Sequence, residues 1–296
     1  MNELKFINYL KKTIKHGKDV VCGIGDDAAV INYRSGKYML FASDMIVEGI
    51  HFSKKDTPQD IGWKAVGINI SDIAAMGGVP KYIVISASAP GNSGLKILKG
   101  IIKGAKKICK AFNVNIVGGD TNRGRNLVID TAIIGEVEKK CLVLRSGAKE
   151  GDLIFVSGAL GKGVLKNLRM VPRLEEARVL VKQFRINSMC DISDGLFLDL
   201  HRLAGASNVG AFIYKSLIPL YSDSTSFSDA LSYGEDFELL FTLSLKEAKK
   251  LMRYIGKHEY PPVTLIGEVV SGKKGLNFVG DEGKVTKIRP RGYLHF

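Results

Sequence analysis

The chain has 296 residues, of which 45% are hydrophobic and 25% are charged, as is usual for folded globular proteins. This length favours two domains of ordinary size over a single core. Lysine and arginine outnumber aspartate and glutamate by 43 to 30, which gives a formal net charge of +13. The N-terminal residues contain no uninterrupted hydrophobic core, and no run approaches the length of a membrane span. We therefore expect no signal peptide, no membrane partner and a cytoplasmic location.

Apolar periodicity and turn residues predict alternating helices and strands in the first half of the chain. The clearest helix begins with Thr57 as its N-cap and Pro58 as its first residue, and it ends at the Gly77-Gly78 pair. The expected helices are residues 4–14, 58–76 and 93–112, and the expected strands are residues 28–31, 38–42, 82–87, 114–117, 127–137 and 141–144.

A polar, turn-rich segment from Arg145 to Gly151 divides the chain. We place the domain boundary there, with an N-terminal domain over residues 1–146 and a C-terminal domain over residues 147–296. Because helices and strands are mixed in both halves, two α+β domains are predicted. The second half is expected to contain strands over 153–157, 209–213, 237–243 and 263–270, and helices over 174–183, 196–205 and 245–255.

One segment contains part of the excess positive charge. Its lysines recur at helical spacing with apolar residues between them, and no acidic residue interrupts them. This pattern predicts an amphipathic helix whose basic face lies in water. A nucleic-acid-binding stripe is the alternative, but no nucleic-acid motif accompanies it, so no nucleic-acid partner is expected. The lysines are Lys96, Lys99, Lys103, Lys106, Lys107 and Lys110.

Several common enzyme motifs are absent from the sequence. The glycine loop at residues 23–28 fits a relaxed dinucleotide pattern, but a strand is expected after it and it contains two carboxylates, which excludes a pyrophosphate site. No GxSxG or HExxH motif occurs, so catalysis by a side-chain nucleophile is not indicated. The cysteines are far apart and lie among apolar residues, which predicts free thiols rather than disulfides or zinc ligands; they are Cys22, Cys109, Cys141 and Cys190.

Aspartates recur at the ends of apolar segments. Asp27 precedes a predicted strand, Asp44 ends one, and Asp120 follows another. Asp191 and Asp194 lie before a predicted helix. Each of them alone has an ordinary structural explanation, because aspartate is a common turn and N-cap residue.

Asp72 is harder to explain as a structural residue. It falls on a stripe at helical spacing that contains Ile61, Ala65, Ile68 and Ala75. The other residues of this helix are also largely apolar, so the helix is expected to be buried. A buried carboxylate without a partner is strongly unfavourable and tends to protonate. Asp72 therefore needs either a lysine or arginine partner, or a cation that it shares with other aspartates.

The candidate ligands all offer oxygen, and no cysteine or histidine clusters with them. Oxygen ligands select a hard ion, magnesium or calcium, over zinc. No EF-hand loop favours calcium. Magnesium takes one or two carboxylates together with substrate phosphates, so the dispersed aspartates predict several magnesium ions that bridge phosphates.

Ordered blocks span nearly the whole chain: GIGDDAAV (23–30), SDMIVEGIHF (43–52), WKAVGINISDIAAMGGVP (63–80), GGDTNRG (118–124), RSGAKEGD (145–152), DISDGLFLDL (191–200) and GEDFELLF (234–241). Their sequence and order resemble the thiamine-monophosphate kinase family, which belongs to the superfamily that includes aminoimidazole ribonucleotide synthetase. The resemblance implies an α+β fold of two mixed α/β domains. The sheet of the N-terminal domain would form a homodimer, and the C-terminal domain would contain a sheet with packed helices.

The resemblance also implies roles for individual residues. The metal ligands would be Asp27, Ser43, Asp44, Asp72, Asp120, Asp191 and Asp194. ATP would be bound by Gly119, Asp120, Arg145 and Ser193. The thiamine substrate would be bound by His51, Glu235 and the terminal aromatic residue Phe296.

The implied reaction is direct, magnesium-dependent transfer of the γ-phosphoryl group of ATP to thiamine monophosphate, which gives thiamine diphosphate and ADP. No residue would act as base or nucleophile, because the attacking phosphate oxygen is already ionised. One departure from the family is Ala42, beside Ser43, where a second hydroxyl is frequent. Two alternatives are another ATP-dependent enzyme of the superfamily with a different oxygen acceptor, and a basic nucleic-acid-binding protein. The second would not explain Asp72.

Overall fold

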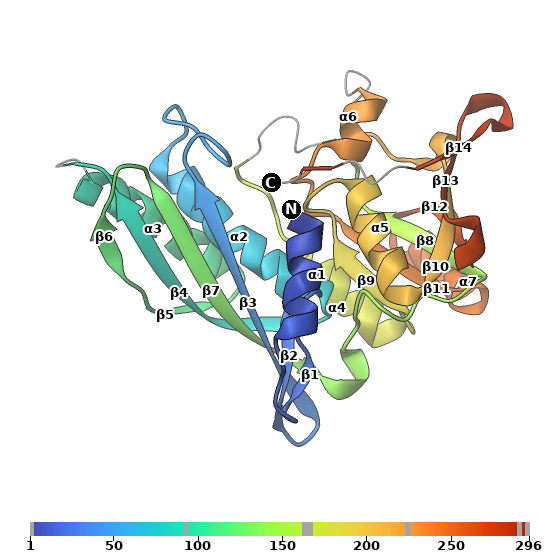
Figure 1. Ribbon diagram of the computed structural model, residues 1–296, viewed down its shortest axis with the longest axis horizontal. Helices are drawn as coiled ribbons and strands as arrows, with labels where there is room; N and C mark the ends of the chain where they lie inside the picture. Colours follow the sequence, from blue (N-terminus) through green and yellow to red (C-terminus); the bar gives the residue numbers. More distant parts are fainter. Residues whose placement is uncertain (1–2, 92–93, 162–167, 223–225, 289–291, 294–296) are drawn as a thin grey trace.

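The structure, a computed structural model, describes residues 3–91, 94–161, 168–222, 226–288 and 292–293. In these residues the strands form two seven-stranded sheets, one from each half of the chain (Figure 1). The sheets lie side by side, and helix α1 (Glu3–Thr13) lies between the two halves. Of the helices within the described ranges, none has the length and apolar character needed to cross a membrane.

The first sheet has the order β1-β2-β3-β7-β4-β5, and β6 pairs with β4. Its centre is the antiparallel pair β3 and β7, whose register runs without a break from Lys37 opposite Glu138 to Val47 opposite Val128. The strands are β1 (Val20–Cys22), β2 (Ala29–Arg34), β3 (Lys37–Val47), β4 (Val79–Ala89), β5 (Asn115–Gly118), β6 (Thr121–Arg123) and β7 (Val128–Glu138).

Helices α2 (Pro58–Ala75) and α3 (Gly94–Ala111) cover one face of the first sheet (Figure 1). Residues of β3 alternate between the two faces, so that Leu40 and Ile46 are buried under α2 while Phe41 and Met45 are exposed on the other face. This second face, which we call the open face, also exposes apolar side chains from β4. They are Tyr82 and Val84.

Helix α2 is the central element of the molecule. It begins as the sequence predicts, because the Thr57 side chain accepts a hydrogen bond from the Asp60 amide at 3.2 Å and Pro58 follows the cap. Most of its length is buried. One side packs on the first sheet and α3, and another side contacts α4 (Leu174–Gln183) and β9 (Ser188–Asp191) of the second half. The prediction of a buried helix is confirmed.

The second sheet has the order β14-β13-β10-β12-β8-β11-β9. Its two faces pack against different helices. Phe155 and Phe241 face α7 and belong to the same hydrophobic core as α2, whereas Ile154 and Leu240 face α5 and form a second core. The elements not yet named are β8 (Asp152–Ser157), β10 (Val209–Tyr214), β11 (Leu239–Ser244), β12 (Val263–Ser271), β13 (Leu276–Val279), β14 (Val285–Lys287), α5 (Leu196–Ser207), α6 (Phe227–Ser232) and α7 (Leu245–His258).

The strand expected over residues 141–144 is absent, and that prediction is wrong. Residues 139–141 form a short 3-10 turn, and the backbone that follows bonds to two different elements. The Val143 amide donates to the Met76 carbonyl at 3.4 Å, and the Met189 amide donates to the Leu144 carbonyl at 3.0 Å. These residues therefore form the crossing between the two sheets, and their apolar character reflects burial in that crossing.

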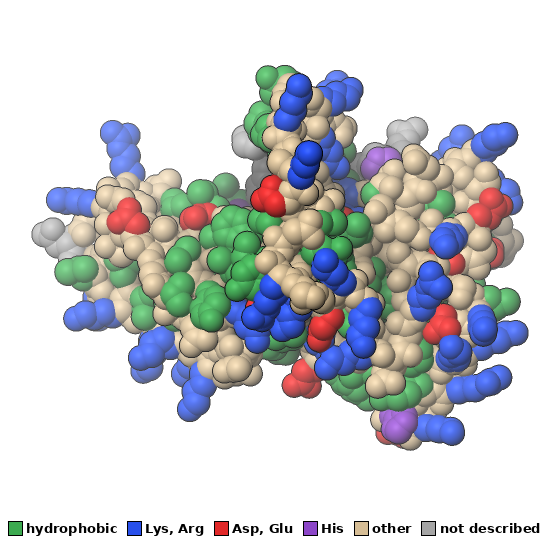
Figure 2. Space-filling model, turned by 90° about the horizontal axis from the view of Figure 1, so that it is seen from below, with side chains coloured by type: hydrophobic (Ala, Val, Ile, Leu, Met, Phe, Trp, Pro, Cys, Tyr) green, Lys and Arg blue, Asp and Glu red, His purple; other side chains and the backbone are tan. Residues whose placement is uncertain are grey.

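The basic helix is confirmed as α3, which buries Ile101 and Ile108 and exposes its lysines. Figure 2 shows lysine and arginine side chains spread over the whole face in view rather than gathered in one stripe. All four cysteines are free thiols, and three of them are buried while Cys22 is half-buried.

Candidate active site

Three carboxylates meet between the two sheets. Asp27 comes from the loop before β2, Asp72 from the last turns of α2, and Asp191 from the end of β9. Each offers one carboxylate oxygen, and these oxygens all lie within 4.8 Å of one another. Asp44 lies close enough to Asp72 for each carboxylate to change the pKa of the other. We call these four residues the carboxylate cluster.

The carboxylate cluster is unfavourable without a counter-charge. Burial raises the pKa of Asp72 well above its usual value, and the charges of Asp44, Asp191 and Asp27 raise it further. Burial likewise raises the pKa of Asp191 and that of Asp44. In the described residues, the buried oxygens Asp27 Oδ2 and Asp191 Oδ1 have no hydrogen-bond partner. Orphaned carboxylate oxygens that converge on one point fit a hard divalent cation.

Arg145 supplies positive charge on one side of the carboxylate cluster. Its guanidinium pairs with Asp27, whose side chain is 1% exposed. Its backbone amide donates to Asp26 Oδ2 at 3.1 Å, and the Asp27 amide donates to Asp26 Oδ1 at 3.1 Å. Burial, followed by the charge of Asp27, raises the pKa of Asp26 to about 6. Asp26 thus holds the glycine loop against Arg145, a role that the sequence did not indicate.

Ser71 aligns the second half with α2. Its hydroxyl donates to Asp191 Oδ2 at 2.6 Å, and both residues are buried. The bond leaves the other Asp191 oxygen directed to the carboxylate cluster. Sequence analysis missed Ser71, although it directly precedes Asp72 on the buried helix.

Asp194 lies apart from the three converging carboxylates. Its side chain pairs with Arg202, which also donates to Asp199 Oδ1 at 2.9 Å. Burial, followed by the charge of Asp194, raises the pKa of Asp199 to about 7. Asp194 also lines the cavity that is described below, and its expected role as a metal ligand stays a prediction.

Ser43 and Asp120 lie on the open face of the first sheet, the side opposite α2. Because β3 alternates, Ser43 points to the open face while Asp44 points inward, and the Ser43 hydroxyl donates to Asp130 at 3.3 Å. Asp120 accepts from the Thr121 amide and from Asn122 Nδ2, both at 2.8 Å, and lines a shallow hollow with Asp130. The side chains of the expected ligand set are therefore not gathered at one point in a single chain.

Gly119, an expected ATP contact, precedes Asp120 with a φ of +155°. A Cβ atom at this position would lie 1.9 Å from the Ile85 carbonyl oxygen. Only glycine fits there, and the close approach to β4 sets the position of the backbone around Asp120.

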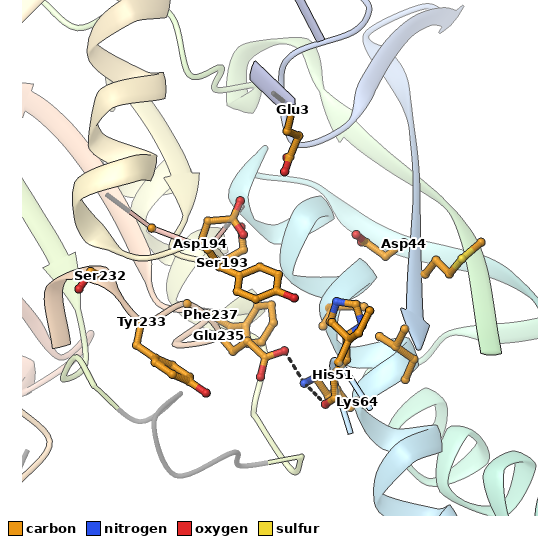
Figure 3. Close-up of a pocket in the computed structure, with 17 residues that line it drawn as sticks. Glu3, Asp44, His51, Lys64, Ser193, Asp194, Ser232, Tyr233, Glu235 and Phe237 are labelled. Atoms are coloured by element: carbon orange, nitrogen blue, oxygen red, sulfur yellow. Dashed lines mark hydrogen bonds and ion pairs between the residues drawn. The ribbon is translucent and has the colours of Figure 1, made fainter. Parts of the chain in front are cut away.

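A cavity of about 420 Å³ adjoins the carboxylate cluster and opens between the two halves (Figure 3). Asp44 borders both. The expected substrate residues His51 and Glu235 lie on its walls, from the first and the second half respectively, together with Ser193. A further wall contains aromatic residues that the sequence did not single out, Tyr233 and Tyr293.

The side chain of Lys64 links His51 to Glu235. The His51 ring accepts a hydrogen bond from the Val47 amide through Nδ1 at 3.0 Å. The Lys64 ammonium donates to the His51 carbonyl at 2.8 Å and pairs with Glu235 Oε1 (Figure 3). Sequence analysis missed Lys64; the available signal was a lysine within the apolar α2 helix, where its side chain is 2% exposed.

Phe296 lies outside the described residues, so its expected role stays a prediction. Tyr293, three positions earlier in the same C-terminal segment, lies in the cavity with its ring centroid 6.5 Å from that of His51. Its amide donates to the Asp194 carbonyl at 3.1 Å, which holds Tyr293 at the wall of the cavity.

Comparisons with known proteins identify the relatives of this chain. The AIR synthase related protein family matches it twice, with the N-terminal domain at residues 25–137 and the C-terminal domain at residues 145–277. The chain is 35% identical to the thiamine-monophosphate kinase of Buchnera aphidicola subsp. Schizaphis graminum, and the alignment covers 100% of this chain and 99% of the relative. It is 32% identical to the thiamine-monophosphate kinase of Bacillus subtilis, with 100% of both chains covered.

Solved structures agree with these relatives. The structure of AaThiL complexed with AMPPCP and TMP matches with a TM-score of 0.84 at 30% identity, covering 100% of this chain and 97% of that chain. The hydrogenase maturation protein HypE of Escherichia coli shares the fold, with a TM-score of 0.72 at 21% identity over 85% of each chain. The chain, with its two mixed α/β units, therefore belongs to the thiamine-monophosphate kinase family.

Proposed function

We propose that this protein transfers the γ-phosphoryl group of ATP to thiamine monophosphate and forms thiamine diphosphate and ADP. The observation that most favours this reaction is the position of Asp44, which belongs to the carboxylate cluster and also borders the cavity. A phosphate bound in that cavity would therefore lie beside a cation site. The relative AaThiL was solved with AMPPCP and TMP, which agrees with two phosphate-bearing ligands in one site.

The carboxylate cluster fits magnesium, because its donors are all oxygen and two of its buried oxygens have no other partner in the described residues. Magnesium bound there would neutralise the negative charge of the phosphates. Asp27, Asp72 and Asp191 would hold it, and Asp44, beside Asp72, remains a proposed metal ligand. Arg145 balances the charge of Asp27 and would add positive charge for ATP. Ser193, Gly119 and Asp120 remain proposed ATP contacts, and Asp194 remains a proposed metal ligand.

The cavity would bind thiamine monophosphate through two kinds of contact. Tyr293 and His51 line the cavity, and their aromatic rings would attract the positively charged thiazolium ring of the substrate, because cations are attracted to aromatic faces. The Glu235 carboxylate accepts hydrogen bonds from an amino group. No general base is needed near the phosphate, since its oxygen is ionised at neutral pH, and this agrees with the lack of a base motif in the sequence.

We also propose that two copies pair through the open face. Its exposed apolar side chains, among them Phe41 and Met45, form the kind of patch that marks an interface. Ser43 and Asp120 lie on this side of the sheet, so pairing would bring a second copy to the two expected ligands that lie away from the carboxylate cluster. The domain boundary near residue 146 and the cytoplasmic location also remain proposals.

An acceptor comparison tests the proposed reaction. The purified protein is supplied with ATP and magnesium, and ADP formation is followed with thiamine monophosphate or with a formylglycinamidine ribonucleotide, the type of acceptor that another enzyme of the superfamily would use. ADP formation that depends on thiamine monophosphate is expected. Turnover only with the second acceptor would favour the alternative enzyme.

A further inference from the structure

Lys64 is a lysine in the interior of the protein. It lies in the second turn of α2, its side chain is 2% exposed, and its ammonium has partners in two different segments. A buried ammonium is strongly unfavourable unless it is paired and hydrogen-bonded. The His51 carbonyl and the Glu235 carboxylate supply those partners, so the side chain has a defined position.

These partners belong to opposite walls of the cavity. His51 ends a tight turn of the first half, in which its own amide donates to the Val47 carbonyl at 3.0 Å. Glu235 belongs to the second half, where its amide donates to the Ser193 carbonyl at 2.7 Å and its φ is +75°. A non-glycine residue rarely adopts that conformation without support. The ion pair with Lys64 is one such support on the cavity side.

We propose that Lys64 is a positioning residue for the acceptor, and this inference rests on the proposed function. Lys64 engages Glu235 Oε1, which turns the carboxylate so that Oε2 is available to an amino group of the ligand. The same ammonium holds the His51 turn at a fixed distance from Glu235. Lys64 thus sets the separation of the two polar walls and acts on the acceptor through Glu235 rather than by direct contact.

Steady-state kinetics of Lys64→Met test this role. Methionine keeps the length of the side chain and removes its charge. We expect the KM for thiamine monophosphate to rise about 10- to 100-fold, the range of one charge-assisted hydrogen bond. The KM for ATP and the kcat at saturating acceptor are expected to change less than about threefold. Lys37→Met is the matched control, because Lys37 pairs with Glu136 at 2.7 Å outside the site; it should leave all three constants unchanged.

A double variant separates positioning from general stabilisation. If Lys64 acts through Glu235, then Lys64→Met combined with Glu235→Gln should raise the acceptor KM no more than Glu235→Gln alone, since coupled residues are not additive. The double variant also removes both charges of the buried pair, so it remains measurable if Lys64→Met alone does not fold.

Three results would overturn the inference. These are an unchanged acceptor KM in folded Lys64→Met, an equal rise of the KM for ATP and for acceptor, and multiplied effects in the double variant. If the unaltered protein shows no turnover with thiamine monophosphate, the proposed function fails and the inference fails with it. That outcome is distinguishable because it appears before any substitution is made.

Discussion

The Ser71 hydroxyl donates a 2.6 Å hydrogen bond to Asp191 across the boundary between the two halves. It joins α2, which packs on the first sheet, to the last residue of β9 in the second sheet. Because Asp72 follows Ser71 directly, this bond also sets the distance between two members of the carboxylate cluster. The proposed cation site therefore depends on contact between the halves.

Ser71→Ala should show this dependence. The substitution leaves Asp191 Oδ2 without its donor, which costs about 1–3 kcal/mol of unfolding free energy for a buried group. Activity should fall, and a higher magnesium concentration should restore part of it. Denaturant unfolding and magnesium titration of turnover measure the two effects. Ser53→Ala, at an exposed hydroxyl that bonds Asp56 at 2.9 Å, is the control, and an equal loss there would argue against a specific role of Ser71.

Asp72→Asn should separate activity from stability. Asparagine cannot ionise, so it removes the cost of either protonating or charging a buried carboxyl group. The metal-free protein should therefore become more stable, while turnover falls roughly 100- to 1000-fold, as for loss of a charge-stabilising group. Turnover and the thermal midpoint in EDTA measure this. Asp56→Asn, outside the carboxylate cluster, should leave turnover unchanged. Near-normal turnover of Asp72→Asn would mean that Asp72 is structural.

The metal-free protein should lose stability as pH rises from about 4 to about 7. Burial raises the pKa of Asp26 to about 6 and that of Asp199 to about 7, from a usual value of 3.8. In this window the folded chain retains protons that the unfolded chain has released, so raising the pH favours unfolding. Below about pH 4 the trend should reverse, because paired carboxylates such as Glu136, whose pKa is lowered mainly by Lys37, lose their charge.

Magnesium should oppose this loss, since a ligand that binds only the folded state stabilises it. Denaturant unfolding at pH 5 and pH 7.5, with EDTA or with magnesium, measures both effects. A metal-free protein that is more stable at pH 7.5 than at pH 5, with no gain from magnesium, would contradict the description of the carboxylate cluster.

The sequence predicted most of the fold because its signals were local. The α2 helix was recognisable from Thr57, Pro58 and its apolar residues, and Asp72 from its place on that helix. The end of β3 was not recognisable from the sequence, since Ser43 and Asp44 are polar. The strand continues to Val47 only through its pairing with β7. The opposite directions of Ser43 and Asp44 follow from strand alternation once that pairing is known.

The parts of the site that the sequence did not predict are long-range contacts. Lys64 bonds to Glu235, a residue 171 positions away, and Ser71 bonds to Asp191, a residue 120 positions away. No periodicity or local spacing contains such pairs. Tyr293 lines the cavity and its amide donates to the Asp194 carbonyl, a long-range contact that the local sequence does not specify.

A charge placed on the open face should disrupt the pairing of two copies. Phe41→Asp places a carboxylate among the exposed apolar residues of β3 and β4, and the proposed dimer should then dissociate to monomers. Sedimentation velocity at micromolar concentration distinguishes the two states. Met252→Asp on α7, another exposed apolar residue, is the control. A monomeric unaltered protein, or a dimer that persists in Phe41→Asp, would exclude this face as the interface.

The most direct test of the proposed reaction is a single-turnover transfer with ATP labelled on its γ-phosphate. Enzyme in excess is mixed with the labelled ATP, magnesium and thiamine monophosphate, and the products are separated and counted. The label should appear in thiamine diphosphate and depend on magnesium, and Asp72→Asn should transfer it far more slowly. Label found only in inorganic phosphate, or in thiamine diphosphate at an equal rate with Asp72→Asn, would contradict transfer at the carboxylate cluster.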